Sequence, residues 1–152
     1  AQIRLELAEQ GYLSAKQQNL KKRRQEKGLG PRLYQASDGT RILVGRNNLQ
    51  NDQLSLKQAN KSFWWLHAKN IPGSHVIIES DQPSDTTLTE AAMLAAYYSK
   101  FQQSANVPVD YLQVKHLRKP NGAKPGYVIY EGQKTLSVTP SSEAVEAMEI
   151  KD

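Results

Sequence analysis

Two of the chain's three histidines, His67 and His75, stand in one segment, FWWLHAKNIPGSHVII, over residues 63–78. Imidazole nitrogens bind metals and move protons, and a turn between two strands could bring both rings together. A carboxylate such as Asp52 or Glu79 could complete the group. Two histidines are too few ligands for a zinc site, and the sequence contains no HExxH spacing. Hydrogen bonds that orient a loop are the commoner role of such residues, and a histidine ring can also stack on an RNA base.

The same segment holds both tryptophans, Trp64 and Trp65. Neighbouring residues of a strand point to opposite faces, so we expect at least one of these side chains to lie in the core. The other, if it is exposed beside a basic loop, would be a platform on which a base of single-stranded RNA stacks. The segment therefore fits three interpretations: a histidine-based chemical site, a nucleic-acid platform or a packed core.

Amide and cationic side chains gather in two loops and one turn. The stretch VGRNNLQND, residues 44–52, follows an apolar strand, and HLRKPNGAKPG, residues 116–126, is punctuated by glycine and proline. Such side chains either satisfy the loop backbone or contact phosphates, 2′-hydroxyls and base edges. The candidates for RNA contact in these loops and in the turn after the tryptophans are Arg46, Asn47, Asn48, Lys69, His75, Arg118, Lys119 and Lys124.

The net charge of +5 comes from the N-terminal segment. Residues 1–34 hold eight Lys and Arg against three Glu, whereas residues 35–152 hold twelve groups of each sign. A localised basic arm is the electrostatic pattern of a protein that binds a polyanion, although a solvated helix face is the commoner cause of a single charge run. The cluster that would contact phosphates in this arm is Lys21, Lys22, Arg23 and Arg24.

The composition narrows the class of protein. With 152 residues, 38% of them hydrophobic, the chain can form one ordinary core, and we expect it to be a fragment of a longer protein. The absence of cysteine excludes disulfides, thiolate zinc sites and cysteine nucleophiles. Because we find no signal segment and no apolar run of about 18 residues, we expect a cytoplasmic protein. No P-loop, GxSxG or GxGxxG motif is present, so we expect no enzyme activity, no catalytic residues, no metal and no cofactor.

Periodicity predicts the elements that carry these side chains. Residues 2–27 are expected to be helical, and the sequence Gly-Leu-Gly-Pro over 28–31 ends that helix. Apolar residues then alternate, and Asp38-Gly39 predicts a hairpin. A capping box of Thr87 and Glu90 opens the clearest helix, whose apolar face runs to Phe101. Further strands are expected over 63–68, 75–79, 111–117, 127–130 and 135–138.

This order of elements predicts an α+β fold. We expect a mainly antiparallel or mixed β-sheet packed against one long helix, with an N-terminal helical segment. We divide the chain into the helical segment at 1–30, a globular domain at 31–140 and an acidic C-terminal tail at 141–152.

Three separated strings resemble one known family. They are SDGTRILVGRNNLQND (37–52), WWLHAKNIPGSHVII (64–78) and GAKPGYVIYEGQKTLSVTP (122–140). In this order and spacing they resemble the NFACT-R domain, over roughly residues 30–140. The earlier string LAEQGYL resembles the end of the helical, coiled-coil middle region that leads into that domain. Ser62 and Asn70 stand where the family often has aspartate, which removes two carboxylates and weakens a metal-dependent interpretation.

The resemblance implies a non-catalytic RNA-binding module of a protein that rescues stalled translation. NFACT proteins bind the large ribosomal subunit with a peptidyl-tRNA, recruit charged tRNA and extend the nascent chain, and bacterial members add alanine. The implied partners are therefore the large ribosomal subunit and tRNA, with no small-molecule substrate.

The names of some relatives imply an alternative. Many Gram-positive members of the family are called fibronectin-binding or fibrinogen-binding proteins. The alternative is thus an adhesin fragment, displayed on the bacterial surface without a signal peptide, that binds fibronectin or fibrinogen, for example by adding a strand at a sheet edge. A hydrolase that uses His67 and His75 is the third hypothesis.

Overall fold

The computed structural model describes residues 29–150. Contacts divide the chain into two compact units, residues 1–30 and 31–152, and the second unit is described here by itself. The predicted N-terminal helix and the cluster Lys21 to Arg24 lie outside the described residues.

The second unit is built on one six-stranded sheet with the order β1-β2-β4-β3-β5-β6. Every neighbouring pair is antiparallel, so the sheet is antiparallel throughout and the predicted α+β class is confirmed. The strands are β1 (Arg32–Gln35), β2 (Arg41–Val44), β3 (Trp64–Ala68), β4 (Val76–Ile78), β5 (Val107–Gln113) and β6 (Lys134–Val138).

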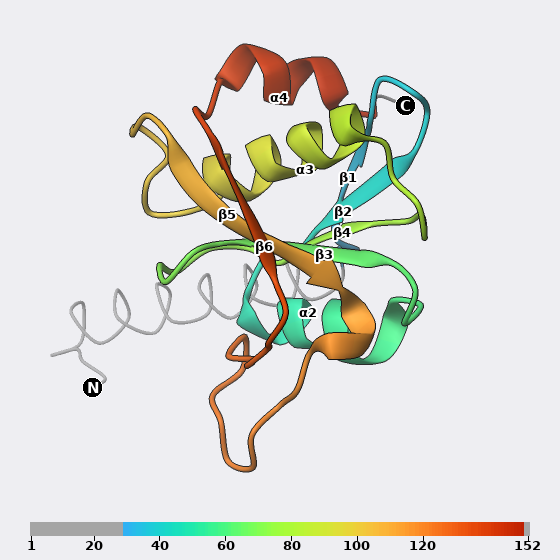
Figure 1. The fold of residues 1–152 in the computed structure, drawn as a ribbon, viewed down its shortest axis with the longest axis vertical. Coiled ribbons are helices and arrows are strands. Elements are labelled where there is room, and N and C mark those ends of the chain that lie inside the picture. Colours follow the sequence, from blue (N-terminus) through green and yellow to red (C-terminus); the bar gives the residue numbers. More distant parts are fainter. Residues whose placement is uncertain (1–28, 151–152) are drawn as a thin grey trace, which may run out of the picture. The chain divides into compact units, whose positions relative to one another are not determined.

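Helices cover both faces of this sheet. Figure 1 shows α3 and α4 on one side and α2 on the other. The helices are α2 (Asn48–Asp52), a π-helix η1 (Gln53–Gln58), α3 (Asp85–Tyr97), a 3₁₀ turn η2 (Val114–His116) and α4 (Ser142–Met148). Within residues 29–150, no helix has the length and apolar character that a membrane span requires.

Strand alternation produces two separate core clusters. Ile42 and Val44 of β2 join α3 in the larger cluster, whereas Leu43 between them faces the other side. Helix α3 brings Ala91 and Ala95, both fully buried, against the sheet, and such small side chains let the helix backbone approach closely.

The two tryptophans point to opposite faces, as predicted. Trp65 belongs to the smaller core cluster and is 1% exposed, whereas Trp64 packs against the larger one and remains partly accessible. The Trp64 indole donates a hydrogen bond of 3.0 Å to the carbonyl of Asp81. Trp64 is therefore held on the α3 side, and Trp65 lies on the side of α2.

The predicted hairpin joins β1 to β2. Arg32 pairs with Val44 and Gln35 with Arg41, and the turn between them contains Asp38-Gly39. Gly39 has φ +93°, a conformation that side chains rarely adopt, and the Asp38 carboxylate accepts the N–H of Thr40 at 3.0 Å. This hairpin prediction is confirmed.

The predicted start of α3 was wrong. The N-cap is Ser84, whose hydroxyl accepts the N–H of Thr87, and the Glu90 carboxylate accepts the N–H of Ser37 instead of completing a capping box. The helix also ends at Tyr97, so Phe101 lies beyond it and is exposed. Long-range contacts with the hairpin turn therefore replaced the local capping pattern.

The C-terminal elements also differ from prediction. Strand β5 begins at Val107 and gives way to η2 after Gln113, and residues 127–130 form no strand but one isolated bridge between Arg118 and Ile129. Helix α4 lies in the segment that we divided off as an acidic tail. Its Val145 and Met148 are buried in the larger core cluster.

Candidate nucleic-acid interface

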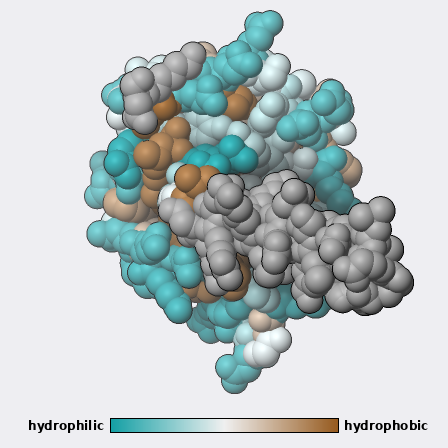
Figure 2. All heavy atoms as spheres, turned by 180° about the vertical axis from the view of Figure 1, so that it is seen from behind, coloured by the Kyte–Doolittle hydropathy of each residue, from teal (hydrophilic) through white to brown (hydrophobic). Residues whose placement is uncertain are grey.

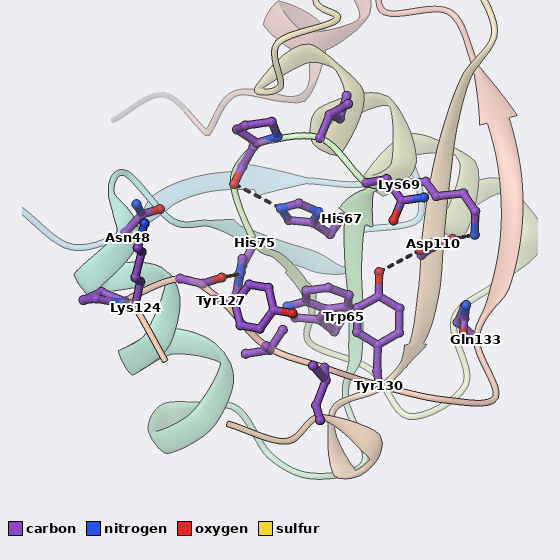
Figure 3. Close-up of a pocket in the computed structure, with 18 residues that line it drawn as sticks. Asn48, Trp65, His67, Lys69, His75, Asp110, Lys124, Tyr127, Tyr130 and Gln133 are labelled. Carbon is purple, nitrogen blue, oxygen red and sulfur yellow. Dashed lines mark hydrogen bonds and ion pairs between the residues drawn. The ribbon is translucent and has the colours of Figure 1, made fainter. Parts of the chain in front are cut away.

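A pocket of about 770 Å³ opens at one end of β3. One wall is the turn after that strand, residues 69–73, and the opposite wall is the loop segment 124–130. Figure 3 shows Trp65, Tyr127 and Tyr130 grouped at its centre, with Asn48 and Lys124 on one side and Lys69 and Asp110 on the other. The pocket thus combines aromatic rings with polar groups at its margin.

Aromatic rings form the floor of the pocket around Trp65. The His67 ring lies parallel to the indole, with centroids 5.5 Å apart, because residues i and i+2 of a strand share a face. The ring of His75 meets the indole edge-on at 5.1 Å, and that of Tyr130 is tilted at 5.0 Å. One tryptophan is therefore packed against a neighbour in its own strand and against two further segments.

Both histidines are held by hydrogen bonds. The Nδ1 atom of His75 lies 2.7 Å from the Ser55 hydroxyl, and its Nε2 lies 2.8 Å from the carbonyl of Gly126. The two nitrogens of His67 lie 2.7 Å from the carbonyl of Ala68 and 3.2 Å from that of Gly73. A neutral His67 ring carries one N–H and donates to only one of these two carbonyls. Each histidine thus ties a loop to the sheet.

Burial keeps both histidines neutral. It lowers the pKa of His75 to about 4, with a further contribution from the neighbouring His67, whose own pKa is also lowered mainly by burial. Among residues 29–150, no three His, Cys, Asp or Glu side chains come together as a metal site would require. Asp52, which we considered as a partner for the histidines, bonds the Gly126 N–H and Lys119 instead.

Asp110 organises the wall on the Lys69 side. Its buried carboxylate accepts hydrogen bonds from Lys69 at 3.1 Å, from the Tyr130 hydroxyl at 2.7 Å and from Thr135 at 2.8 Å. Burial and the hydrogen bond to Asp110 raise the pKa of Tyr130, so its phenol stays protonated at neutral pH. The ring of Tyr130 is therefore fixed in place.

Asp52 and Lys119 hold the wall formed by residues 124–130. The Lys119 ammonium forms an ion pair of 3.1 Å with Asp52 and donates to the carbonyls of Lys124 and Tyr127. Asp52 also accepts the N–H of Gly126 at 2.9 Å. The loop is thus fastened to the end of α2.

The profile of the NFACT protein RNA binding domain matches residues 31–134. The chain belongs to this family. The match spans the whole sheet as far as the first residue of β6, including every segment that lines the pocket. The resemblance drawn from the three sequence strings is confirmed.

Proteins named Rqc2 homolog RqcH are similar to this NFACT domain over nearly its full length. The protein of Bacillus subtilis is 47% identical across 95% of the chain, and that of Streptococcus suis is 51% identical across 98%. The chain spans about a quarter of the length of these relatives, 25% and 27% respectively.

A solved structure shares the fold. It is the C-terminal part of the fibronectin/fibrinogen-binding protein of Streptococcus suis, which is 54% identical to this chain with a TM-score of 0.79. The likeness covers 80% of this chain and 50% of that one.

Four of the predicted RNA-binding residues of this NFACT domain line the pocket: Asn48, Lys69, His75 and Lys124. They come from α2, from the turn after β3, from the position just before β4 and from the loop before β6. The sheet order brings these four residues to one end of β3. His75 is 1% exposed, so its part in the pocket is to support the floor.

The other predicted residues have different surroundings. Asn47 caps α2 by accepting the N–H of Gln50, and the backbone N–H of Arg46 is bonded to the side chain of that same glutamine. Arg118 is exposed and borders a separate depression, and Lys119 is engaged in the loop as described.

Among the aromatic and charged residues of the pocket, sequence reasoning missed three: Asp110, Tyr127 and Tyr130. Asp110 offered one signal, since a carboxylate within the apolar run VPVDYLQV requires partners once it is buried. The tyrosines carried no comparable signal because they stand in a string expected to be an ordinary strand.

Proposed function

We propose that this domain is a non-catalytic, cytoplasmic module that binds the RNA of the large ribosomal subunit and tRNA during ribosome quality control. One observation carries the proposal within the family. Amide and cationic side chains from separate segments, Asn48, Lys69 and Lys124, line a single pocket whose floor is aromatic. Proteins that recognise unpaired RNA commonly combine aromatic faces with cations that meet the phosphates.

The charge of the pocket suits a polyanion. Lys124 is exposed, and within the part of the chain that the structure describes its ammonium has no carboxylate partner. Lys69 forms an ion pair with Asp110, yet 37% of the Lys69 side chain remains accessible. Figure 2 shows the molecule from behind Figure 1, where hydrophilic residues cover most of the coloured surface and hydrophobic areas are smaller.

Binding titrations at several salt concentrations test this proposal. The chain is titrated with tRNA and with isolated large ribosomal subunits, in parallel with the variants Lys124→Glu and Lys61→Glu. Lys61 is the matched control because it is also exposed but lies before β3, at the opposite end of that strand from Lys69. Within residues 29–150, neither ammonium forms an ion pair with a carboxylate.

The proposal predicts a linear fall of the logarithm of the binding constant with that of salt, about 0.7 for each phosphate neutralised on unpaired RNA. Lys124→Glu should weaken binding by about ten-fold and reduce this slope by about 0.7, the share of one phosphate contact, whereas Lys61→Glu should bind as the wild type does. Equal effects of both variants, or a binding constant that does not respond to salt, would contradict the proposal.

The solved neighbour's name is the observation that favours a second function, surface binding of fibronectin or fibrinogen. That name describes the neighbour, and the pocket beside Trp65 gives no separate support to fibronectin binding. Immobilised fibronectin therefore serves as a comparison in the same titrations. Capture by fibronectin with no binding to either RNA would favour the adhesin hypothesis over ours.

A further inference from the structure

We propose that the pocket beside Trp65 receives one unstacked nucleobase of the bound RNA. This inference rests on the proposed RNA-binding function and specifies what enters the site. The shared chemistry is that of a nucleotide, a flat base with hydrogen-bond acceptors joined to a phosphate. The source argued for is an RNA chain rather than a free nucleotide.

The pocket is large enough for a base together with its sugar and phosphate. Its volume of about 770 Å³ falls within the range of about 300 to 1,000 Å³ that small ligands occupy. A base in a duplex is paired and stacked on both faces, so a concave site of this kind is open only to a base that has left the stack.

Aromatic faces are available to such a base. Tyr127 is 57% exposed, although it lies in the pocket wall with a large apolar ring. Tyr130 is half-buried and immobilised through Asp110. A solvent-exposed ring beside a fixed one forms the kind of platform on which bases stack whatever their sequence.

The floor supplies a hydrogen-bond donor without an acceptor. Trp65 Nε1 is buried, and no hydrogen-bond partner for it exists within the described residues. Buried donors in native proteins are nearly always paired, so an unpaired one in a pocket lining indicates a group that the site receives. Every nucleobase carries acceptors on its edges. Figure 3 shows the Tyr127 ring beside Trp65, and because Tyr127 is exposed its side chain can change rotamer when a base enters.

Cations at the margin suit the attached phosphate. Figure 3 shows Lys124 and Lys69 on opposite sides of the aromatic group. A purely apolar ligand would leave the Trp65 N–H unpaired and the ammonium of Lys124 unused, whereas a bare anion would not use the rings. A nucleotide uses all three features.

Indole NMR tests the proposal directly, because the chain has two tryptophans and therefore two indole N–H signals. The Trp64 indole already donates to the Asp81 carbonyl and is the internal control. A Trp64→Phe variant assigns the signals. The probes are a single-stranded oligoribonucleotide, the same strand in a duplex, and the four nucleoside 5′-monophosphates.

Stacking is tested with variants of Tyr127. Tyr127→Ala removes the ring and Tyr127→Phe keeps it, while Phe101→Ala removes an exposed aromatic ring that is outside the pocket. We expect Tyr127→Ala to bind the single strand about ten-fold more weakly, the effect of losing one stacked base, with Tyr127→Phe and Phe101→Ala near the wild type.

The single strand should shift the Trp65 signal and leave the Trp64 signal in place. The duplex and the monophosphates should shift the Trp65 signal much less. If the RNA binds with the expected salt response but the Trp65 signal does not move, the base pocket is wrong and the RNA-binding function stands. If a monophosphate binds more tightly than the single strand, the occupant of the pocket is a free nucleotide and not RNA, and the proposal is overturned. If wild-type protein binds neither tRNA nor large subunits, the proposed function itself fails.

Discussion

The side chain of Asp52, at the end of α2, accepts a hydrogen bond of 2.9 Å from the backbone N–H of Gly126, although the two residues are 74 positions apart. The same carboxylate pairs with Lys119, which in turn donates to the carbonyls of Lys124 and Tyr127. One carboxylate therefore fastens the basic loop beside the pocket.

Replacement of Asp52 should release that loop. We expect Asp52→Ala to lower the free energy of unfolding by about 1 to 3 kcal/mol, because the Gly126 N–H and the Lys119 ammonium lose their acceptor. Asp52→Asn keeps an acceptor for the N–H and should cost less. Urea denaturation gives the energies, and amide exchange should quicken over residues 119–130 in Asp52→Ala. Unchanged exchange there would show that the loop is held by other contacts.

Acid should destabilise the domain through His75. Its folded pKa of about 4 lies below the ordinary value of 6.5, so the folded state prefers the neutral ring and protons favour the unfolded state. The contribution of His75 to the free energy of unfolding is therefore intact above pH 6.5 and is lost as the pH falls toward 4. We expect a loss of about 2 to 3 kcal/mol between pH 7 and pH 4.5 from this group.

Urea denaturation across that pH range provides the measurement. Carboxylates also begin to titrate in its lower part, so the wild type is compared with His75→Gln, which lacks the imidazole. The variant should be less stable at pH 7 and should lose less stability on acidification. Parallel curves for the two proteins would mean that His75 does not carry the pH dependence.

Gly45 is required by the approach of Asn51. A Cβ atom at position 45 would lie 1.9 Å from the Asn51 Oδ1, the atom that accepts the His75 N–H at 3.2 Å. Gly45→Ala should therefore displace Asn51 and cost about 2 kcal/mol, as overpacking of a buried site does. Gly30→Ala is the matched control because an added Cβ there meets nothing within 4 Å. Equal melting temperatures for both variants would contradict this prediction.

Asp110 should matter more for stability than any one of its partners. Asp110→Ala leaves Tyr130, Thr135 and Lys69 without their acceptor, and we expect a cost of about 2 to 3 kcal/mol, moderated because Lys69 can be rehydrated. Tyr130→Phe removes one of these hydrogen bonds and should cost about 1 kcal/mol. Denaturation curves of the two variants measure both losses in the free energy of unfolding. A loss for Asp110→Ala no greater than that for Tyr130→Phe would show that Asp110 does not act as the common acceptor.

Local sequence signals predicted the elements whose structure is set locally. The β1–β2 hairpin follows from Asp38-Gly39, and the alternation of Trp64 and Trp65 follows from the period of a strand. The start of α3 was misjudged because Glu90 bonds Ser37 across space. The start of β5 was missed because Pro108 suggested an interruption, yet the strand includes it and its carbonyl accepts the N–H of Lys69.

The pocket could not be assembled from sequence, because its parts depend on the order of the strands. Asn48 and Lys124 were recognised as RNA-binding candidates from their residue types, but their proximity needs the Asp52 contact with the basic loop. Tyr127 and Tyr130 were assigned to a strand, and the bridge of Ile129 to Arg118 instead leaves them in the pocket wall. The binding residues were thus predicted by type and not by arrangement.

Hydrogen exchange of the whole chain with and without saturating tRNA tests the central claim most directly, since it maps the surface that RNA covers. Our account predicts slower amide exchange in two segments that border the pocket, residues 69–75 and 124–130, with the hairpin turn at residues 37–40 unchanged as the internal control. Protection confined to the hairpin turn and α3, with both pocket segments exchanging as in the free protein, would contradict it.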